Sequence, residues 1–307
     1  MKYPPLTIIA FNRPNLLVKL LGIVSRSYTG YVYFVIDGPR EHVESDRSLV
    51  EQVLNLANEY LKENPGEILA SEVNLGCYHR IKTGIDEVLS RNPYTIILED
   101  DCHPSDGFFD WISILLESYR YDDSVGTVCG TNLQDSGSMN GESYFRNFFP
   151  ITWGWGTWAN AWKQFVAKEE AFIRHLDSNH IKGLCKGKMR YWYWKRIWQR
   201  TYSGEIVAWD YRWVLTCLLN DYDCITSSVN LVENVGGVDD ATNTAGSPFL
   251  FRAKSDPIEI SGQSESVTFN HQYDQFLEDT FYSKNLINRI KWLMSKLKEK
   301  THEVFTS

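Results

Sequence analysis

The chain has 307 residues, 43% of them hydrophobic, and a formal net charge of −8. This length and composition suffice for a full hydrophobic core, in one large α/β domain or in two closely packed subdomains. The acidic balance argues against nucleic acid as the main partner, because phosphate backbones bind basic surfaces. A nucleotide remains a possible ligand, since one metal ion can neutralise a diphosphate locally.

The sequence carries no signal for secretion or for a membrane span. The apolar run that starts at Leu6 is too short for a signal peptide, and no later segment reaches transmembrane length. The six cysteines show neither a CxxC pair nor metal-type spacing, which is typical of reduced thiols; a disulfide between distant cysteines is the less favoured alternative. We therefore expect a cytoplasmic protein and leave open its association with the inner face of a membrane.

Apolar strands and amphipathic helices alternate through residues 1–130. The predicted strands are Leu6–Ala10, Tyr31–Ile36, Glu67–Ser71, Thr95–Leu98 and Val125–Cys129. One helix is predicted to begin near Pro14, and the others to cover Asp46–Lys62, Gly76–Leu89 and Gly107–Tyr121. This alternation predicts an α/β fold with a mostly parallel central sheet flanked by helices.

After Gly130 the pattern becomes irregular and rich in aromatic residues. The segment from Trp153 to Gly156 alternates tryptophan with glycine, which predicts Gly-rich turns. We expect residues 1–130 to bind a nucleotide. Residues 131–283 are expected to form the other half of the same domain, which would bind a second substrate, the acceptor, and carry the catalytic base. Residues 284–307 carry an amphipathic basic helix, which packs against protein or lies on a membrane surface.

An acidic triplet, Glu99-Asp100-Asp101, follows a strand that we expect to be buried. In parallel sheets, ligands bind beyond the carboxyl ends of the strands, and Arg13 and Asp37 fall at two other such ends. Adjacent carboxylates repel one another unless a cation is present, and Mg²⁺ or Mn²⁺ often share oxygen ligands with phosphates. The triplet indicates a metal–diphosphate site or, alternatively, a solvated loop. Strand geometry would place Glu99 and Asp101 on one side and Asp100 on the other.

Four segments, in this order, resemble the GT-A glycosyltransferases, especially the N-acetylglucosaminyltransferase I type and its bacterial relatives. They are Ile9–Arg13, Ile96–Cys102 with Phe108-Phe109, Phe148–Pro150 with Trp153–Trp158, and Trp209–Trp213. The resemblance covers about residues 6–244. It implies a GT-A fold and an inverting, metal-dependent transfer of a hexosyl or N-acetylhexosaminyl group in polysaccharide biosynthesis. The implied donor is a nucleotide-diphosphate sugar, with UDP-sugar favoured, and the implied acceptor is a glycan or lipid-linked hydroxyl.

The resemblance also implies roles for single residues. Asp101 would ligate Mn²⁺ or Mg²⁺, Asp100 would approach the ribose, and Glu99 would face the donor sugar. Nucleotide contacts would come from Arg13, Asp37 and Arg80. The acceptor would meet Trp153, Trp155 and Trp209, and core packing around a tight turn is the alternative role of Trp153 and Trp155.

Asp210 is the candidate catalytic base. Inverting transfer needs a base that takes the proton of the acceptor hydroxyl, and the departing diphosphate needs a metal to stabilise its charge. The aromatic neighbours of Asp210 predict a raised pKa, which makes a carboxylate a better base. Capping of a helix is a second role, compatible with the first.

Two other classes of protein are alternatives. A sugar-nucleotide nucleotidyltransferase would carry a Gly-rich, Arg-containing loop after its first strand, and Phe11–Pro14 does not provide one. A non-catalytic carbohydrate-binding relative would not need both Asp101 and Asp210.

Two further features bear on ligands. The stretch from Lys186 to Arg196 interleaves basic and aromatic residues, as single-strand nucleic-acid platforms do. The acidic chain favours instead a helix with its aromatic residues packed inward, and contact with an anionic or lipid-linked acceptor is the second alternative. Asn243 stands where bacterial relatives tend to carry a histidine.

Overall fold

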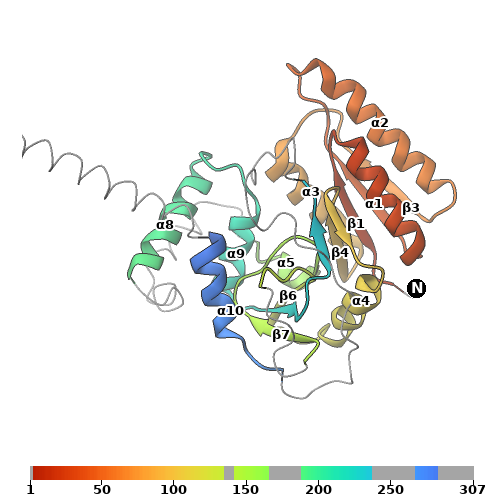
Figure 1. Cartoon of the computed structure of the whole chain (residues 1–307). Coiled ribbons are helices and arrows are strands. Elements are labelled where there is room, and N and C mark those ends of the chain that lie inside the picture. The colour runs from red at the N-terminus through yellow and green to blue at the C-terminus, as the bar shows by residue number, and fades with distance from the viewer. Residues whose placement is uncertain (1–2, 135–141, 166–187, 237–266, 283–307) are drawn as a thin grey trace, which may run out of the picture.

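The computed structural model describes residues 3–134, 142–165, 188–236 and 267–282 (Figure 1). They form an eight-stranded sheet in the order β3-β2-β1-β4-β8-β6-β9-β7, with a separate ribbon of β5 and β10. The expected mixed α/β fold, with a mostly parallel central sheet flanked by helices, is confirmed. No helix within these ranges is long and apolar enough to cross a membrane. Asn243 and the C-terminal tail lie outside the described residues.

The first half of the sheet is parallel throughout. Its strands are β1 (Leu6–Ala10), β2 (Val32–Ile36), β3 (Gly66–Ala70) and β4 (Tyr94–Glu99). The helices between and after them are α1 (Pro14–Ser27), α2 (Glu44–Leu61), α3 (Gly76–Arg91) and α4 (Phe108–Ser118). These elements confirm the predicted strands and helices to within a few residues, and Pro14 starts α1 as expected.

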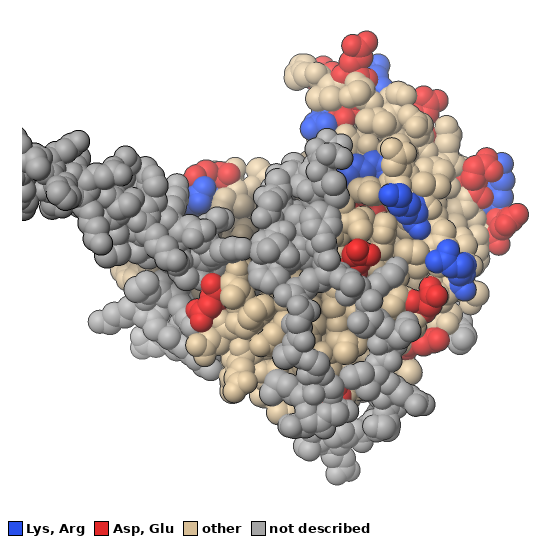
Figure 2. All heavy atoms as spheres, in the orientation of Figure 1, with Lys and Arg blue, Asp and Glu red and all other residues tan. Residues whose placement is uncertain are grey.

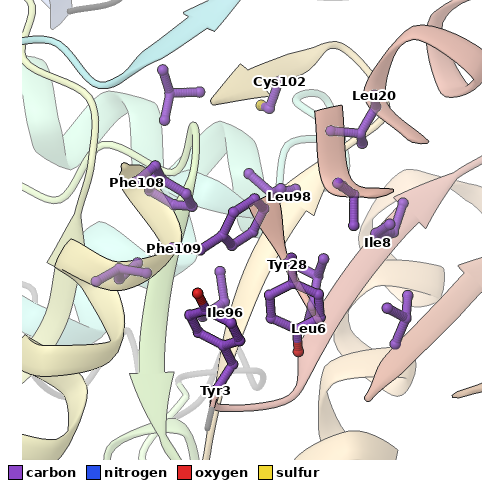
Figure 3. Packing of buried hydrophobic residues seen from close by; sticks show 14 of the residues in the cluster. Tyr3, Leu6, Ile8, Leu20, Tyr28, Ile96, Leu98, Cys102, Phe108 and Phe109 are labelled. Atoms are coloured by element: carbon purple, nitrogen blue, oxygen red, sulfur yellow. The ribbon is translucent and has the colours of Figure 1, made fainter. Parts of the chain in front are cut away.

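Alternate side chains of β1, β2 and β4 enter two different hydrophobic cores. One core lies against α1, α2 and α4, and Figure 3 shows Leu6 and Ile8 of β1 beside Ile96 and Leu98 of β4 within it. The other core lies against α3 and holds Ile9, Val35 and Ile97 among its members. Because both faces are covered, these strands are apolar nearly throughout, which explains why the sequence pattern revealed them.

The second half of the sheet is mixed. β8 (Trp155–Trp158) lies antiparallel between β4 and β6 (Val125–Cys129), and β9 (Asp223–Ser227) lies between β6 and β7 (Tyr144–Asn147). The prediction of Gly-rich turns is therefore wrong from Trp155 onward. Gly156 pairs with Ile96 and Val128, and a β-carbon there would press on Leu116 at 2.9 Å. A residue without a side chain lets this strand pack closely beneath α4.

The helices of the second half are α5 (Ala159–Trp162), α8 (Lys188–Tyr202), α9 (Asp210–Leu219), α10 (His271–Phe276) and a π-helical turn over Leu277–Tyr282. Figure 1 shows α8, α9 and α10 at the other end of the molecule from α1 and α2, whereas α5 packs against α3. On α8, Trp194 and Trp198 are buried, as expected for inward packing, whereas Trp192 is 62% exposed. On the face drawn in Figure 2, acidic and basic side chains are interspersed over the N-terminal half.

Candidate active site

The acidic triplet lies at the carboxyl end of β4, as predicted. β4 ends at Glu99, and Asp100 and Asp101 form the turn into β5 (Cys102–Pro104). The N–H of Asp100 donates to the carbonyl of Ile9 in β1 (3.0 Å). Because β1 and β4 are parallel neighbours, the loop that follows β1 reaches this turn.

Arg13 lies in that loop and pairs with two of the three carboxylates. Its Nε donates to Oδ2 of Asp100 (3.3 Å), its Nη2 to Oδ1 of Asp100, and its Nη1 to Oδ2 of Asp101 (3.0 Å). Burial works to lower the pKa of Arg13, but the charges of Asp100 and Asp101 outweigh burial and raise it. Since one guanidinium bridges both side chains, the prediction that Asp100 points away from Asp101 is wrong. Strand alternation stops at Glu99, where the strand ends.

Carboxylates outnumber cations around this turn. Burial and then the charge of Asp101 raise the pKa of Glu99 above its ordinary value, and the charges of Asp100 and Asp210 add to the effect. Burial also raises the pKa of Asp100, although the Arg13 guanidinium works against it. Buried like charges disfavour full ionisation, so the cluster is short of positive charge.

Asp210 begins α9, and one of its oxygens accepts the N–H of Tyr211 (2.9 Å). Burial raises its pKa, as the aromatic setting predicts, although backbone hydrogen bonds work against the shift. Its negative charge acts on Glu99 and on Cys77. Trp209, directly before Asp210, stacks on Trp155 of β8, which pairs with Ile97 in β4. The start of α9 is therefore packed against the strand next to the one that carries the triplet.

Cys77 marks the place where these groups approach one another. It follows the first residue of α3 and is accessible to solvent. Protein surrounds its thiol closely enough for desolvation, followed by the charges of Glu99 and Asp210, to raise the pKa to about 12. Sequence reasoning missed this residue, because an isolated cysteine at a helix start carries no distinctive signal.

Asp37 anchors the start of α3. Its Oδ1 accepts from the N–H groups of Gly38 (3.0 Å) and Leu75 (2.9 Å), and its Oδ2 from the amide of Asn74 (3.0 Å) and the N–H of Gly76 (2.9 Å). A carboxylate offers about four acceptor positions, so these bonds occupy all of them. A direct contact between Asp37 and a nucleotide stays a prediction.

Arg80 connects α3 to β3. Its Nη2 donates to the carbonyl of Leu69, and its Nη1 to the hydroxyl of Thr83 (3.5 Å). Burial lowers the pKa of Arg80, and the charge of Asp37 partly restores it. These partners belong to the scaffold, and a contact between Arg80 and the nucleotide stays a prediction.

The three candidate tryptophans differ in exposure. Trp155 is 1% and Trp209 is 4% exposed, and their rings stack with centroids 5.5 Å apart. Both belong to the core that also holds Trp213, so core packing, the alternative role, describes Trp155 as it lies here. Trp153 is only partly buried, with its ring edge-on to Phe281 at 5.7 Å. Of the three, Trp153 offers the largest accessible surface to an acceptor.

Asn234 is a neighbour of Asp101 that sequence reasoning missed. It ends β10 (Val232–Asn234), and its Nδ2 donates to Oδ1 of Asp101 (3.3 Å). The only signal was a short alternation of apolar and polar residues before Gly236, which is too short to predict a strand.

The donor set suits a hard divalent cation. Among the described residues, no three His, Cys, Asp or Glu side chains converge as a complete metal site. In a metal site at this turn Asp101 would supply one carboxylate, and Mg²⁺ and Mn²⁺ commonly complete such a shell with water and substrate phosphates. The shortage of positive charge around the triplet fits an added cation.

No family model and no curated protein sequence matches the chain. Solved structures that overlap it include GalNAc-T7 with UDP, GalNAc and Mn²⁺ (9% identity, TM-score 0.45, covering 74% of this chain and 42% of that chain). Another is S. aureus TarS 1–349 (10% identity, TM-score 0.40, covering 73% of this chain and 58% of that chain). A third is the mannosyltransferase PcManGT from Pyrobaculum calidifontis with GDP-Man and Mn²⁺ (13% identity, TM-score 0.33, covering 50% of this chain and 44% of that chain). The chain thus spans about half the length of these structures.

Proposed function

We propose that the chain is an inverting, metal-dependent GT-A glycosyltransferase, which moves a sugar from a nucleotide-diphosphate donor to a hydroxyl of a glycan or lipid-linked acceptor. One observation carries the proposal: Trp209, directly before Asp210, stacks on Trp155 of β8, which pairs with Ile97 near the end of β4. The proposed metal ligand and the proposed base, from opposite halves of the chain, would then share one site.

The residues of the first half bind and orient the donor. Asp101 holds the divalent cation, Mn²⁺ or Mg²⁺, Asp100 approaches the ribose, and Glu99 faces the donor sugar. Arg13 bridges Asp100 and Asp101 in the structure described here. With a divalent cation held by Asp101, the Arg13 guanidinium would be available to the donor diphosphate, since its fork geometry matches phosphate oxygens.

Asp210 acts on the acceptor. As the acceptor oxygen attacks the anomeric carbon, Asp210 takes the hydroxyl proton, and the bond to the diphosphate breaks on the opposite face. A bound divalent cation supplies Lewis-acid stabilisation of the negative charge on the departing diphosphate. The raised pKa of Asp210, caused by burial, improves proton uptake near neutral pH.

The proposal includes a cellular location and a pathway class. We place the enzyme in the cytoplasm, in polysaccharide biosynthesis, with UDP-sugars as the favoured donors. Residues 284–307, with their basic amphipathic pattern, give it a peripheral contact with the inner face of the membrane.

A donor panel tests the proposal. Purified chain is incubated with UDP-, GDP- and other nucleotide sugars and with Mn²⁺ or Mg²⁺, and donor hydrolysis and transfer are measured. We expect turnover of at least one donor that requires the metal, and a product whose anomeric configuration by NMR is opposite to that of the donor. Asp101→Asn serves as the variant without the metal ligand, and Asp123→Asn, on an exposed loop, as the control.

Three results would contradict the proposal. If neither metal supports turnover of any donor, the glycosyltransferase assignment fails. Retention of anomeric configuration would remove Asp210 as the base of an inverting reaction. Formation of a nucleotide sugar from a nucleoside triphosphate and a sugar phosphate would favour the nucleotidyltransferase alternative.

A further inference from the structure

A strand from the second half of the chain lies against the turn that carries Asp101. β10 pairs antiparallel with β5, with Asn234 opposite Cys102. Directly after β10, the N–H of Val235 donates to the backbone carbonyl of Asp101 (2.9 Å). The backbone of the candidate metal ligand is therefore bonded to a segment far away in the sequence.

The two carboxylate oxygens of Asp101 have different partners. Oδ1 accepts from the amide of Asn234 (3.3 Å) and from the thiol of Cys102 (3.6 Å). Oδ2 accepts from Arg13 (3.0 Å). The neutral partners thus hold Oδ1, while the charged partner is on Oδ2.

The Asn234 side chain is itself fixed. It is 6% exposed, and its Oδ1 accepts the N–H of Gly236 (3.0 Å) while its Nδ2 donates to Asp101. Both ends of the amide are therefore bonded, and the hydrogen bond to the Gly236 N–H makes the nitrogen the end that faces the carboxylate. Such a side chain can orient its partner without rearranging.

Gly236 lies against the same carboxylate from another side. A β-carbon built on this glycine would collide with Oδ2 of Asp101 and would lie 3.1 Å from its Cβ. A side chain larger than hydrogen would therefore push Oδ2 out of its position. The next residue, Cys102, is 0% exposed and packs in the hydrophobic core shown in Figure 3. The turn that carries Asp101 therefore cannot shift to relieve such a collision.

We infer that Asn234 and Gly236 are positioning residues for the divalent cation at Asp101. Asn234 holds Oδ1, so that Oδ2 is presented to the cation, and Gly236 leaves the space that Oδ2 needs. This inference rests on the proposed function, because it requires a cation at Asp101. The bond from Asn234 to Oδ1 does not involve the oxygen that Arg13 contacts, so it would fix the rotation of the carboxylate with a cation bound as well. Hydrogen bonds that orient a metal-binding side chain typically increase metal affinity by about 10- to 100-fold.

The test measures Mn²⁺ binding to the full chain rather than catalysis. Free Mn²⁺ is followed by EPR during titration, with the metal alone and with UDP or GDP added. We expect Asn234→Ala to weaken Mn²⁺ binding about 10-fold or more, and Gly236→Ala to weaken it at least as much, while Asp101→Asn abolishes it.

Asn147→Ala is the matched control. Asn147 is also fully buried and uses both ends of its amide, donating to the carbonyl of Phe149 (2.8 Å) and accepting from Thr226 (2.7 Å). It lies on β7 at the far edge of the sheet from β3, with three strands between it and β4. We expect Asn147→Ala to lower the melting temperature without changing Mn²⁺ affinity.

The outcomes separate the two proposals. If wild type binds Mn²⁺ and Asp101→Asn does not, but both Asn234→Ala and Gly236→Ala bind it like wild type, the positioning inference is overturned and the metal assignment stands. If wild type and Asp101→Asn bind Mn²⁺ equally, the metal assignment fails, and the inference fails with it. Thermal unfolding by circular dichroism checks that each variant is folded, and Gly236→Ala decides the question if Asn234→Ala does not fold.

Discussion

The two halves of the sheet are organised in different ways. In the first half, β1 to β4 run parallel and are separated by helices, and every strand pairing is between parallel neighbours. In the second half, β8 inserts antiparallel between β4 and β6, while β9 lies between β6 and β7. The junction of the halves is the β4–β8 pairing, and the candidate site lies at the end of β4. Residues of both halves therefore determine the geometry of the site.

The cores differ in the same way. The first half packs mainly aliphatic side chains between strands and helices. Near the junction, the rings of Trp155, Trp162, Trp209 and Trp213 form one cluster with centroids between 5.1 and 6.3 Å apart. Aromatic rings bury large areas and prefer specific offsets. This cluster therefore fixes the position of the start of α9, where Asp210 lies.

The largest expected effect follows from removing the centre of this cluster. Trp155→Ala is expected to lower the free energy of unfolding by about 3–5 kcal/mol, because a fully buried indole leaves a cavity. Urea unfolding monitored by circular dichroism measures the change. Trp192→Ala is the control, since Trp192 is 62% exposed and should cost less than about 0.5 kcal/mol. Equal losses in the two variants would contradict a cluster centred on Trp155.

Removing the proposed base tests whether the second half takes part in the chemistry. Asp210→Asn keeps the shape of the side chain but cannot take a proton, so kcat is expected to fall about 10³-fold. Mn²⁺ affinity should stay unchanged, because Asp101 and not Asp210 is the proposed metal ligand. Steady-state kinetics with the donor found in the panel provides the measurement. Full activity in Asp210→Asn would remove the base assignment and leave the fold description intact.

A third prediction concerns an ionic contact in the first half. Asp46 is fully buried, and hydrogen bonds from Arg40 and then from Asn12 lower its pKa to about 2, although desolvation works against them. An acid whose pKa is lowered by folding stabilises the protein above its unfolded pKa of about 3.9. That contribution disappears as the pH falls towards 2.

Asp46→Asn should therefore lower the free energy of unfolding by about 1–2 kcal/mol at pH 7, with allowance for the half-exposed Arg40. The difference from wild type should narrow as the pH is lowered from about 5 towards 2. Urea unfolding across this range gives the comparison. Glu59→Gln, in an exposed pair with Lys62, is the control and should change the free energy of unfolding at pH 7 by less than about 0.5 kcal/mol. A difference between Asp46→Asn and wild type that stays constant with pH would contradict the ionic origin.

The smallest expected effect concerns a contact between the halves. The Arg212 guanidinium lies 4.2 Å from the ring centroids of both Tyr78 in α3 and Tyr202 in α8. Arg212→Lys keeps the charge but loses the planar stacking, so it should cost about 1 kcal/mol. Arg120→Lys is the matched control, because Arg120 stacks on Tyr94 and Tyr121 at the longer distances of 5.6 and 5.4 Å. Thermal unfolding compares the two, and a smaller loss in Arg212→Lys would contradict a link between the halves.

The difference between the two halves of the sheet explains why the strands of the first half were predicted correctly and β8 was not. Strands such as Leu6–Ala10 are buried on both faces, so they appear as apolar runs, and the helices between them show regular periodicity. β8 contains Trp155-Gly156-Thr157-Trp158, and its glycine is typical of a turn when read locally. Glycine suits this position because β8 packs so closely against β4 and α4 that a β-carbon on Gly156 would collide with them. β5 and β10 are three residues each, too short for a periodic signal.

By itself, the sequence determined the α/β class, the elements of the first half and the position of the acidic triplet at a strand end, because local periodicity and apolar runs encode these features. Its resemblance to GT-A enzymes also singled out Asp101 and Asp210. Tertiary structure alone decided that Arg13 bridges Asp100 and Asp101, that Asp37 is saturated by the start of α3, and that Asn234 holds Asp101. These contacts join segments far apart in the chain, and their partners follow from strand order, which no local pattern encodes.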